Sequence, residues 1–319
     1  MTPGRWFFVD GQLRPVWRCF LSVVLMFFAV AISNTVVAGA FRLVGVQPSL
    51  PTSLLFSVMA MLVAVLGVFK LMTAVFEHRP LASMGLAFHS RWWTELGYGL
   101  AFGTAMMACV GCLEWALGLA SFTVSSNHLF STGSYRFLFL AVAATNEEVA
   151  FRGYPFQRLV ESITPVGAVA LTSALFGLAH LGNPHPTWIS TANTMLAGIF
   201  LAVAYLRTRA LWMPIGAHFT WNYVQGFVLG LPVSGIHFER SILQAQVKGA
   251  DWLTGGSYGP EGGLLVTLVV VVGTIYLLLS KRIYTSKEME ALVAGPSSLE
   301  QSEPAEKVAP ADPEEDKLG

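Results

Sequence analysis

The sequence predicts an all-α polytopic membrane protein with about eight transmembrane helices and an intramembrane active-site cavity. The chain has 319 residues, of which 54% are hydrophobic and only 12% are charged, whereas about a quarter of the residues of a soluble domain are charged. The hydrophobic residues fall in blocks of about 18 residues or more, the length that crosses a bilayer as a helix. A soluble globular domain and a disordered chain are therefore excluded. The formal net charge of zero also gives no basic surface for nucleic acid.

Eight apolar blocks define the expected helices. They cover residues 17–39, 52–76, 94–122, 136–158, 163–181, 187–206, 211–229 and 264–280. Grouped by composition, the segments are a cytoplasmic N-terminus (1–16), N-terminal transmembrane helices (17–134), a core with ionisable residues (135–230), a Gly-rich outer loop (231–263), a last transmembrane helix (264–285) and an acidic tail (286–319). The tail has no aromatic residue and is rich in Pro, Ser, Ala and Glu, so we expect it to be disordered.

The distribution of Lys and Arg predicts the orientation of the helices, because these residues accumulate on the cytoplasmic side. With the N-terminus inside, twelve of them lie near cytoplasmic helix ends and four on the outer side. The twelve are Arg5, Arg14, Arg18, Lys70, Arg79, Arg91, Arg158, Arg207, Arg209, Lys281, Arg282 and Lys287. Both termini are therefore expected in the cytoplasm.

Three charged residues interrupt the fourth apolar block. Glu147, Glu148 and Arg152 lie within one expected helix, and ionisable residues inside a membrane face the interior of the bundle and are candidates for function. Glu148 and Arg152 are four residues apart, so they share one helix face and can form an ion pair. Glu147 points about 100° away, which makes it the candidate general base or acid. An ion-pair network that only holds the helices together is the structural alternative.

Two further helices carry histidines. His180 ends the fifth block, and His218 lies in the seventh, four residues before Asn222 on the same helix face. An acid, two histidines and an amide on three helices can converge on one water molecule. A proton relay or a metal site are the alternatives, because Glu and His are also zinc ligands.

Other protease signatures do not fit the chain. It lacks a His-Glu-x-x-His motif, which excludes a zincin helix. Its aspartates all lie outside the expected helices, which excludes an intramembrane aspartate pair; they are Asp10, Asp251, Asp312 and Asp316. Gly255-Gly-Ser257-Tyr-Gly259 matches Gly-x-Ser-x-Gly, but without a preceding strand we interpret it as turns before the last helix.

Three motifs occur in order on successive expected helices: Glu147-Glu148-x-x-x-Arg152, Phe176-x-x-x-His180 and His218-x-x-x-Asn222. Together they resemble the motifs of the CPBP family, also called the Abi family. These are intramembrane CAAX-processing and bacteriocin-processing proteases, including type II CAAX prenyl endopeptidases. The similarity covers about residues 135–230, and the sequence departs nowhere from the motif positions.

The resemblance implies an intramembrane endopeptidase that hydrolyses a peptide bond of a membrane-associated protein or peptide. Glu147 would activate a water molecule, helped by His180. His218 and Asn222 would hold the oxyanion that forms at the amide carbon. A non-catalytic membrane adaptor or a transporter that uses the same charged cavity is the alternative from another class.

The resemblance also implies that Glu148 and Arg152 position the site. The resemblance does not decide whether a metal is required. Many relatives are called metalloproteases, whereas another view of the family has a glutamate activate the water without a required metal. We expect no required cofactor, with zinc as the alternative. The expected partners are the lipid bilayer and a membrane-associated peptide or protein substrate, with no nucleic acid. The expected location is a bacterial inner membrane.

Overall fold

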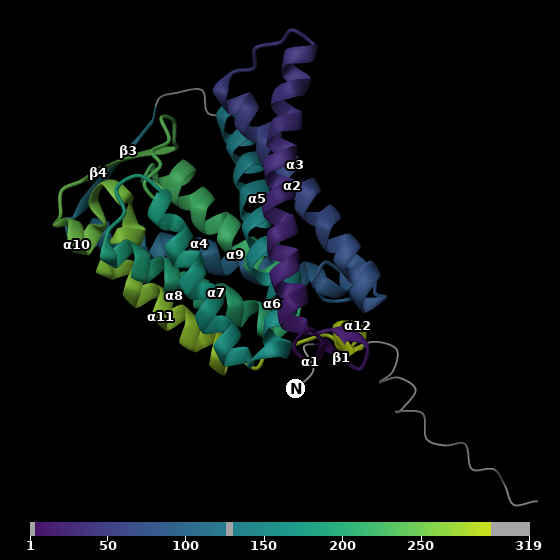
Figure 1. The fold of residues 1–319 in the computed structure, drawn as a ribbon. Helices are drawn as coiled ribbons and strands as arrows, with labels where there is room; N and C mark the ends of the chain where they lie inside the picture. Colours follow the sequence, from purple (N-terminus) through teal and green to yellow (C-terminus); the bar gives the residue numbers. More distant parts are fainter. Residues whose placement is uncertain (1–3, 126–129, 295–319) are drawn as a thin grey trace, which may run out of the picture.

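The computed structural model describes residues 4–125 and 130–294 of the chain. These residues are mainly helical (Figure 1). The longer helices are α2 (Pro15–Leu43), α3 (Leu50–Met72), α4 (Trp92–Ala116), α5 (Phe130–Arg152), α7 (Pro165–Ala179), α8 (Trp188–Thr208), α9 (Trp212–Tyr223) and α11 (Leu264–Leu279). The short helices are α1 (Gly4–Phe7), α6 (Tyr154–Ser162), α10 (Asp251–Thr254) and α12 (Lys287–Ala294).

The strands form two antiparallel pairs. β1 (Phe8–Val9) pairs with β2 (Gln12–Leu13), and β3 (Ala120–Val124) pairs with β4 (Leu243–Val247). Two π-helical segments extend α3 and α9, at Thr73–Glu77 and Val224–Leu229. The 3-10 turns are Leu81–Met84, His180–Gly182, Gly256–Tyr258 and Pro260–Gly262.

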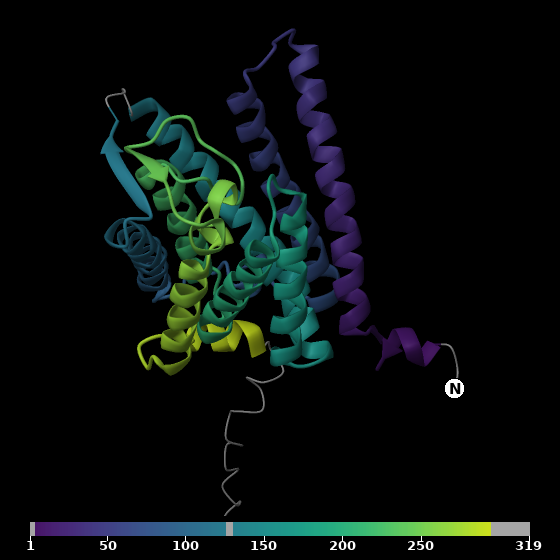
Figure 2. The ribbon, with the colours of Figure 1, turned by 90° about the vertical axis from the view of Figure 1, so that its left-hand side faces the viewer.

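Each expected block contains a helix, but the count of eight spans is not confirmed. Within the described residues, five helices are long and apolar enough to cross a membrane: Pro15–Leu43, Leu50–Glu77, Trp92–Ala116, Pro165–Gly182 and Trp188–Thr208. α11 is apolar but has only 16 residues, and α9 has 12 before its π-helical extension. α2 and α3 form a long hairpin at one side of the other helices (Figure 2).

The expected helix 136–158 is interrupted directly after Arg152. Gly153 separates α5 from α6, and Pro155 lies in the first turn of α6. Proline lacks the N–H that would continue the ladder of α5. A Cβ at Gly153 would lie 2.3 Å from the carbonyl oxygen of Val149, so the tight turn requires glycine. α5 therefore ends at Arg152, the last residue of the charged motif that the sequence places in mid-helix.

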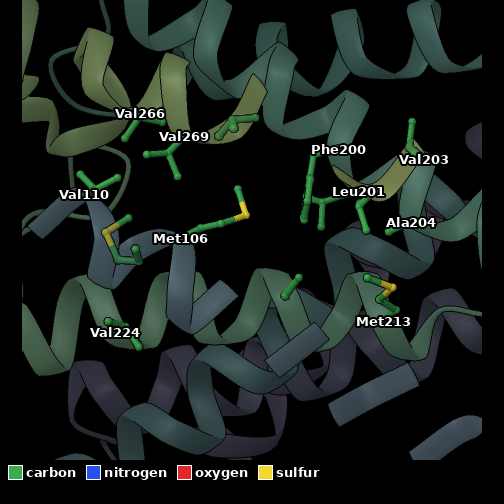
Figure 3. Packing of buried hydrophobic residues seen from close by; sticks show 14 of the residues in the cluster. Met106, Val110, Phe200, Leu201, Val203, Ala204, Met213, Val224, Val266 and Val269 are labelled. Carbon is green, nitrogen blue, oxygen red and sulfur yellow. The ribbon is translucent and has the colours of Figure 1, made fainter. Parts of the chain in front are cut away.

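The main hydrophobic core joins α4, α8, α9 and α11 (Figure 3). Buried side chains of this core include Met106, Val110, Phe200, Leu201, Val266 and Val269. A second buried cluster joins α3, α6 and α8 through Phe69, Phe156 and Tyr205. The candidate site residues lie on helices that these two clusters hold together.

α4 and α9 approach closely because small residues face each other at their contact. A Cβ at Gly99 would lie 2.2 Å from the carbonyl oxygen of Met213, and one at Gly103 would lie 2.1 Å from that of Ala217. A Cβ at Gly216 of α9 would lie 2.8 Å from the carbonyl oxygen of Leu96. Small residues at these positions allow two backbones to pack directly, as in many membrane helix pairs. This contact sets the position of α9.

Glu77 joins three elements at the end of α3. Its carboxylate accepts hydrogen bonds from Arg18 of α2 at 3.1 Å, from Arg158 of α6 at 2.6 Å and from the Tyr154 hydroxyl at 2.8 Å. Two cations and one hydroxyl thus bind the same buried carboxylate. The network fixes α2 and α6 against the end of α3.

The beginning of the expected disordered tail is ordered. Lys287–Ala294 form α12, whose Met289 is fully buried, and Arg79 donates to the carbonyl oxygen of Val293 at 2.6 Å. The prediction of disorder is therefore wrong for this helix, because Met289 has a buried tertiary site that composition does not reveal. Residues 295–319, the rest of the expected tail, lie outside the described residues.

Basic residues tie the C-terminal segment to the same end of the molecule as the N-terminus (Figure 1). Arg91 donates to the Tyr284 hydroxyl at 2.7 Å, and Arg207 donates to the carbonyl oxygen of Ile283 at 2.6 Å. Both arginines belong to the group that the sequence places on the cytoplasmic side. Hydrogen bonds to backbone and hydroxyl oxygens stabilise these arginines, so several positive charges can lie at this end of the molecule.

The expected outer loop, 231–263, is a packed segment. β4 pairs with β3 along five residues, and Leu231, Val233 and Tyr258 are buried. The predicted helix 94–122 is correspondingly shorter, because Ala120–Val124 leave α4 and form β3. The segment folds back toward α8 and α9 and contributes one wall of the cavity that they enclose.

Replacing Gly103 with alanine tests the contact between α4 and α9. The added methyl group collides with the α9 backbone, and overpacking of this kind costs about 1–3 kcal/mol. We expect a lower thermal unfolding midpoint for the purified protein in detergent. Gly97→Ala is the matched control, because Gly97 is on the same helix and a Cβ there has no neighbour within 4 Å. Equal midpoints for Gly103→Ala and Gly97→Ala would contradict the packing argument.

Candidate active site

A cavity of about 430 Å³ lies among α5, α7, α8, α9, α11 and the segment 231–263. Four residues that the sequence singles out line it: Glu147 of α5, His180 at the end of α7, and His218 and Asn222 of α9. Most of its other walls are apolar, and include Phe139, Leu140, Phe151, Phe176, Phe200 and Val266. The cavity thus combines a mainly hydrophobic lining with a group of polar side chains, as ligand sites do.

Glu147 lies between the two histidines. Its Oε2 atom is 3.9 Å from Nε2 of His180 and 3.8 Å from Nε2 of His218. These distances are too long for direct hydrogen bonds, but one water molecule can bridge polar groups at such a separation. The Glu147 side chain is 36% exposed, and its Oε2 has no hydrogen-bond partner within the described chain. This carboxylate is therefore available to a water or substrate in the cavity.

The hydrogen bond at the other side of the His180 ring determines its orientation. Nδ1 lies 2.7 Å from the carbonyl oxygen of Phe176, which can only accept, so Nδ1 carries the proton. In the neutral ring Nε2 is then an acceptor, and it faces Glu147. The spacing of the Phe176-x-x-x-His180 motif follows from this contact across one helical turn.

Glu148 and Arg152 lie behind the cavity wall. The ion pair predicted from their spacing is confirmed, with Arg152 Nη1 3.0 Å from Glu148 Oε1 and both side chains buried. The same oxygen lies 2.8 Å from Nδ1 of His218. Arg152 also donates to the carbonyl oxygen of Gly198 in α8 at 3.1 Å, and its guanidinium lies 4.5 Å from the centre of the Phe176 ring.

This buried group orients His218. Because a carboxylate only accepts hydrogen bonds, the Nδ1–H of His218 points to Glu148 and Nε2 points to the cavity. Glu148 balances the charge of Arg152, which a buried guanidinium requires. The two residues therefore support the cavity wall from behind, whereas Glu147, His180, His218 and Asn222 face the cavity itself.

Glu147 and the two histidines lie farther apart than the ligands of one bound zinc ion. Atoms that bind one tetrahedral zinc at about 2.0–2.1 Å lie about 3.3 Å from one another, whereas Glu147 lies 3.8 and 3.9 Å from the two imidazole nitrogens. Among the described residues, no group of three or more His, Cys, Asp or Glu side chains is arranged to hold a metal ion.

Sequence reasoning missed polar residues that line another part of the cavity. Glu261, Ser234 and Asn193 all face it, and the first two come from the segment interpreted only as a loop. Glu261 is the one acid among the glycines of residues 255–263, which was the available signal. Ser257 is exposed and is not among the residues that line this cavity.

Comparison with known proteins agrees with the motif analysis. Residues 130–224 match the family described as type II CAAX prenyl endopeptidase Rce1-like. The predicted family is thereby confirmed for these residues. It is a family of proteases, and the matched range contains all seven named residues of the three motifs. No curated protein and no solved structure matches the chain.

Arg152→Ala tests whether the buried ion pair supports this domain. The substitution leaves the Glu148 carboxylate buried without its cation, which costs on the order of 3–5 kcal/mol. We expect a strongly reduced folded yield and a lower thermal midpoint. The control is Glu161→Ala, which breaks the ion pair between Arg158 and Glu161, whose side chain is 44% exposed. Exposed pairs contribute about 0–1 kcal/mol. An Arg152→Ala protein as stable as the control would show that the pair is dispensable.

Proposed function

We propose that this chain is an intramembrane endopeptidase that hydrolyses a peptide bond of a membrane-associated protein or peptide. The observation that carries the proposal is the convergence of Glu147 with His180 and His218 in one apolar cavity. The family match over residues 130–224 supports a protease, and five helices suited to a membrane support a substrate at the bilayer.

Glu147 acts as the general base that activates water. A water between Glu147 Oε2 and His180 Nε2 donates one hydrogen to each, because both atoms are acceptors in the geometry described. A lone pair of its oxygen is then free to attack the amide carbon. Glu147 takes the proton that the water loses and later gives it to the leaving amine. The side chain is therefore a carboxylate again at the end of each turnover.

His218 and Asn222 stabilise the oxyanion that forms when water adds to the amide. They lie four residues apart on α9 and both line the cavity. The Asn222 side-chain amide offers N–H donors. When the His218 ring carries both protons, its Nε2–H donates to the oxyanion, while its Nδ1–H stays hydrogen-bonded to Glu148 at 2.8 Å. Donors held in advance around a developing charge are an effective source of rate acceleration.

Glu148 and Arg152 act as positioning residues. They contact no part of the cavity, but they fix the ring of His218 and connect α5 to α8 and α9. Their role is to keep the reacting groups in place before substrate arrives, which removes a cost of orientation from the reaction.

We also propose a bacterial inner membrane as the location, with both termini in the cytoplasm. The excess of Lys and Arg at one set of helix ends supports this orientation. So does the position of the N-terminus and of α12 at one end of the molecule (Figure 1), where Arg79, Arg91 and Arg207 hold the C-terminal segment.

Glu147→Gln tests the role of the general base. The amide has nearly the same shape but cannot take the proton from water, so we expect normal abundance and no cleavage. The measurement is a comparison of the termini of membrane peptides in cells that produce the wild type or the variant. The control is Glu161→Gln, which changes an acid outside the cavity. Cleavage by Glu147→Gln at the wild-type rate would refute the mechanism.

In the same assay, Asn222→Ala should retain weak cleavage, because loss of one oxyanion donor costs about 10²–10³ in rate.

Chelation separates this mechanism from a zinc-dependent one. If Glu147 and His180 alone activate the water, a strong chelator should leave the activity of the purified protein unchanged, with zinc bound at well below one ion per chain. A zinc-dependent reaction would stop on chelation and resume when zinc is added, because the metal would then activate the water. Stoichiometric zinc with activity that follows it would overturn the metal-free mechanism and leave the protease assignment in place.

A further inference from the structure

A second acidic residue lines the cavity, and it comes from a different part of the chain than Glu147. Glu261 belongs to the 3-10 turn Pro260–Gly262 in the segment after β4, beyond the residues that match the family. It lines the same cavity as Glu147 and is only 8% exposed. None of the steps proposed above uses this group.

The backbone around Glu261 is held firmly. Asn193 of α8 donates to the carbonyl oxygens of Glu261 and Gly263, each at 2.8 Å. Thr267 donates in turn to the Asn193 side-chain oxygen at 2.6 Å. Gly259 has φ +96°, and a Cβ there would lie 2.1 Å from the carbonyl oxygen of Pro232. These contacts therefore fix the turn that carries Glu261 beside the cavity.

The carboxyl group has neutral donors but no cation. Its Oε2 accepts from Gln225 Nε2 at 2.5 Å and from the backbone N–H of Ser234 at 3.3 Å, and Oε1 lies 3.5 Å from the Ser234 hydroxyl. The Trp221 side chain also hydrogen-bonds to the carboxyl group. No ion pair to Glu261 forms within the part of the chain that the structure describes. Burial raises the pKa of Glu261 to about 7. Glu77 and Glu148, by contrast, each bind arginine.

The length of α9 and its extension gives an approximate distance between Glu261 and the reacting groups. Gln225, which contacts the Glu261 carboxylate, follows His218 by seven residues along α9 and its extension. Seven residues of helix span about 10 Å. An extended peptide covers that distance in about three residues. Glu261 is therefore within reach of a substrate side chain near, but not at, the bond that is cleaved.

We propose that Glu261 determines substrate specificity by binding a Lys or Arg side chain about three residues from the cleaved bond. The inference rests on the proposed endopeptidase function. In an apolar cavity a carboxylate that has only neutral donors gains most from a cation, because charge-assisted hydrogen bonds are stronger than neutral ones. An acidic side chain at the same substrate position is disfavoured, because two like charges would be brought together without water.

The test compares the termini of membrane peptides, by mass spectrometry, in cells that produce one form of the full chain. The forms are wild type, Glu147→Gln, Glu261→Gln, Glu261→Asp and Glu239→Gln. Cuts that are present with wild type and absent with Glu147→Gln define the substrates. Glu239 is exposed on the same outer segment and does not line the cavity, so its variant controls for the loss of one negative charge.

We expect wild-type cuts to be enriched in Lys or Arg at one fixed position about three residues from the cut. In Glu261→Gln, cleavage at cationic sites should fall at least tenfold relative to neutral sites, the factor for one charge-assisted hydrogen bond. Glu261→Asp and Glu239→Gln should keep the enrichment. Since the enrichment is a ratio within one sample, a lower abundance of a variant does not alter it.

Three results would decide against the inference. Wild-type cuts without a cationic position would overturn it, and so would an unchanged enrichment in Glu261→Gln, which would leave Glu261 as a purely structural support of the outer segment. In both cases cuts that depend on Glu147 would still support the endopeptidase. If no cut depends on Glu147, the proposed function itself fails, and the role of Glu261 fails with it.

Discussion

The carboxylate of Glu148 is the interaction on which the arrangement of the site depends. It accepts from Arg152 one turn along α5 and from His218 on α9, and Arg152 reaches on to α8. One buried anion thereby joins three helices and balances one permanent positive charge. In a low-dielectric interior such a group is stable only when each member is paired, so the helices that carry it have little freedom to move apart.

Adjacent acids in this chain have opposite environments. Glu148 is fully buried and its Oε1 accepts hydrogen bonds from both Arg152 and His218, whereas the Glu147 side chain is 36% exposed and lies 3.8 and 3.9 Å from the two histidines. The difference arises from the rotation of about 100° between neighbouring positions of a helix. α5 thus supplies a structural carboxylate and a reactive one from consecutive residues, and it ends soon after them at Gly153, where the chain turns into α6.

The surroundings of the site depend on contacts between distant segments. Glycines of α4 let α9 pack against its backbone and so determine where His218 and Asn222 lie. The segment after α9 returns to form a wall of the cavity, held by the pairing of β4 with β3 and by Asn193 of α8. Glu147 and the polar residues of this wall come from distant parts of the chain, with Glu147 and Glu261 more than a hundred residues apart.

The sequence by itself determined the helical class, the place of each main helix and the motif residues, because hydrophobic length and the four-residue spacing of Glu148 and Arg152 are local properties. It did not determine the break at Gly153, the order of α12 or the wall contributed by Glu261. The last two depend on partners far along the chain, a buried site for Met289 and the amide of Gln225, and at Gly153 the side chain of Met84 packs 3.0 Å from the place of a Cβ. Only the tertiary structure brings those partners together, because packing between segments is not encoded in the periodicity of either segment alone.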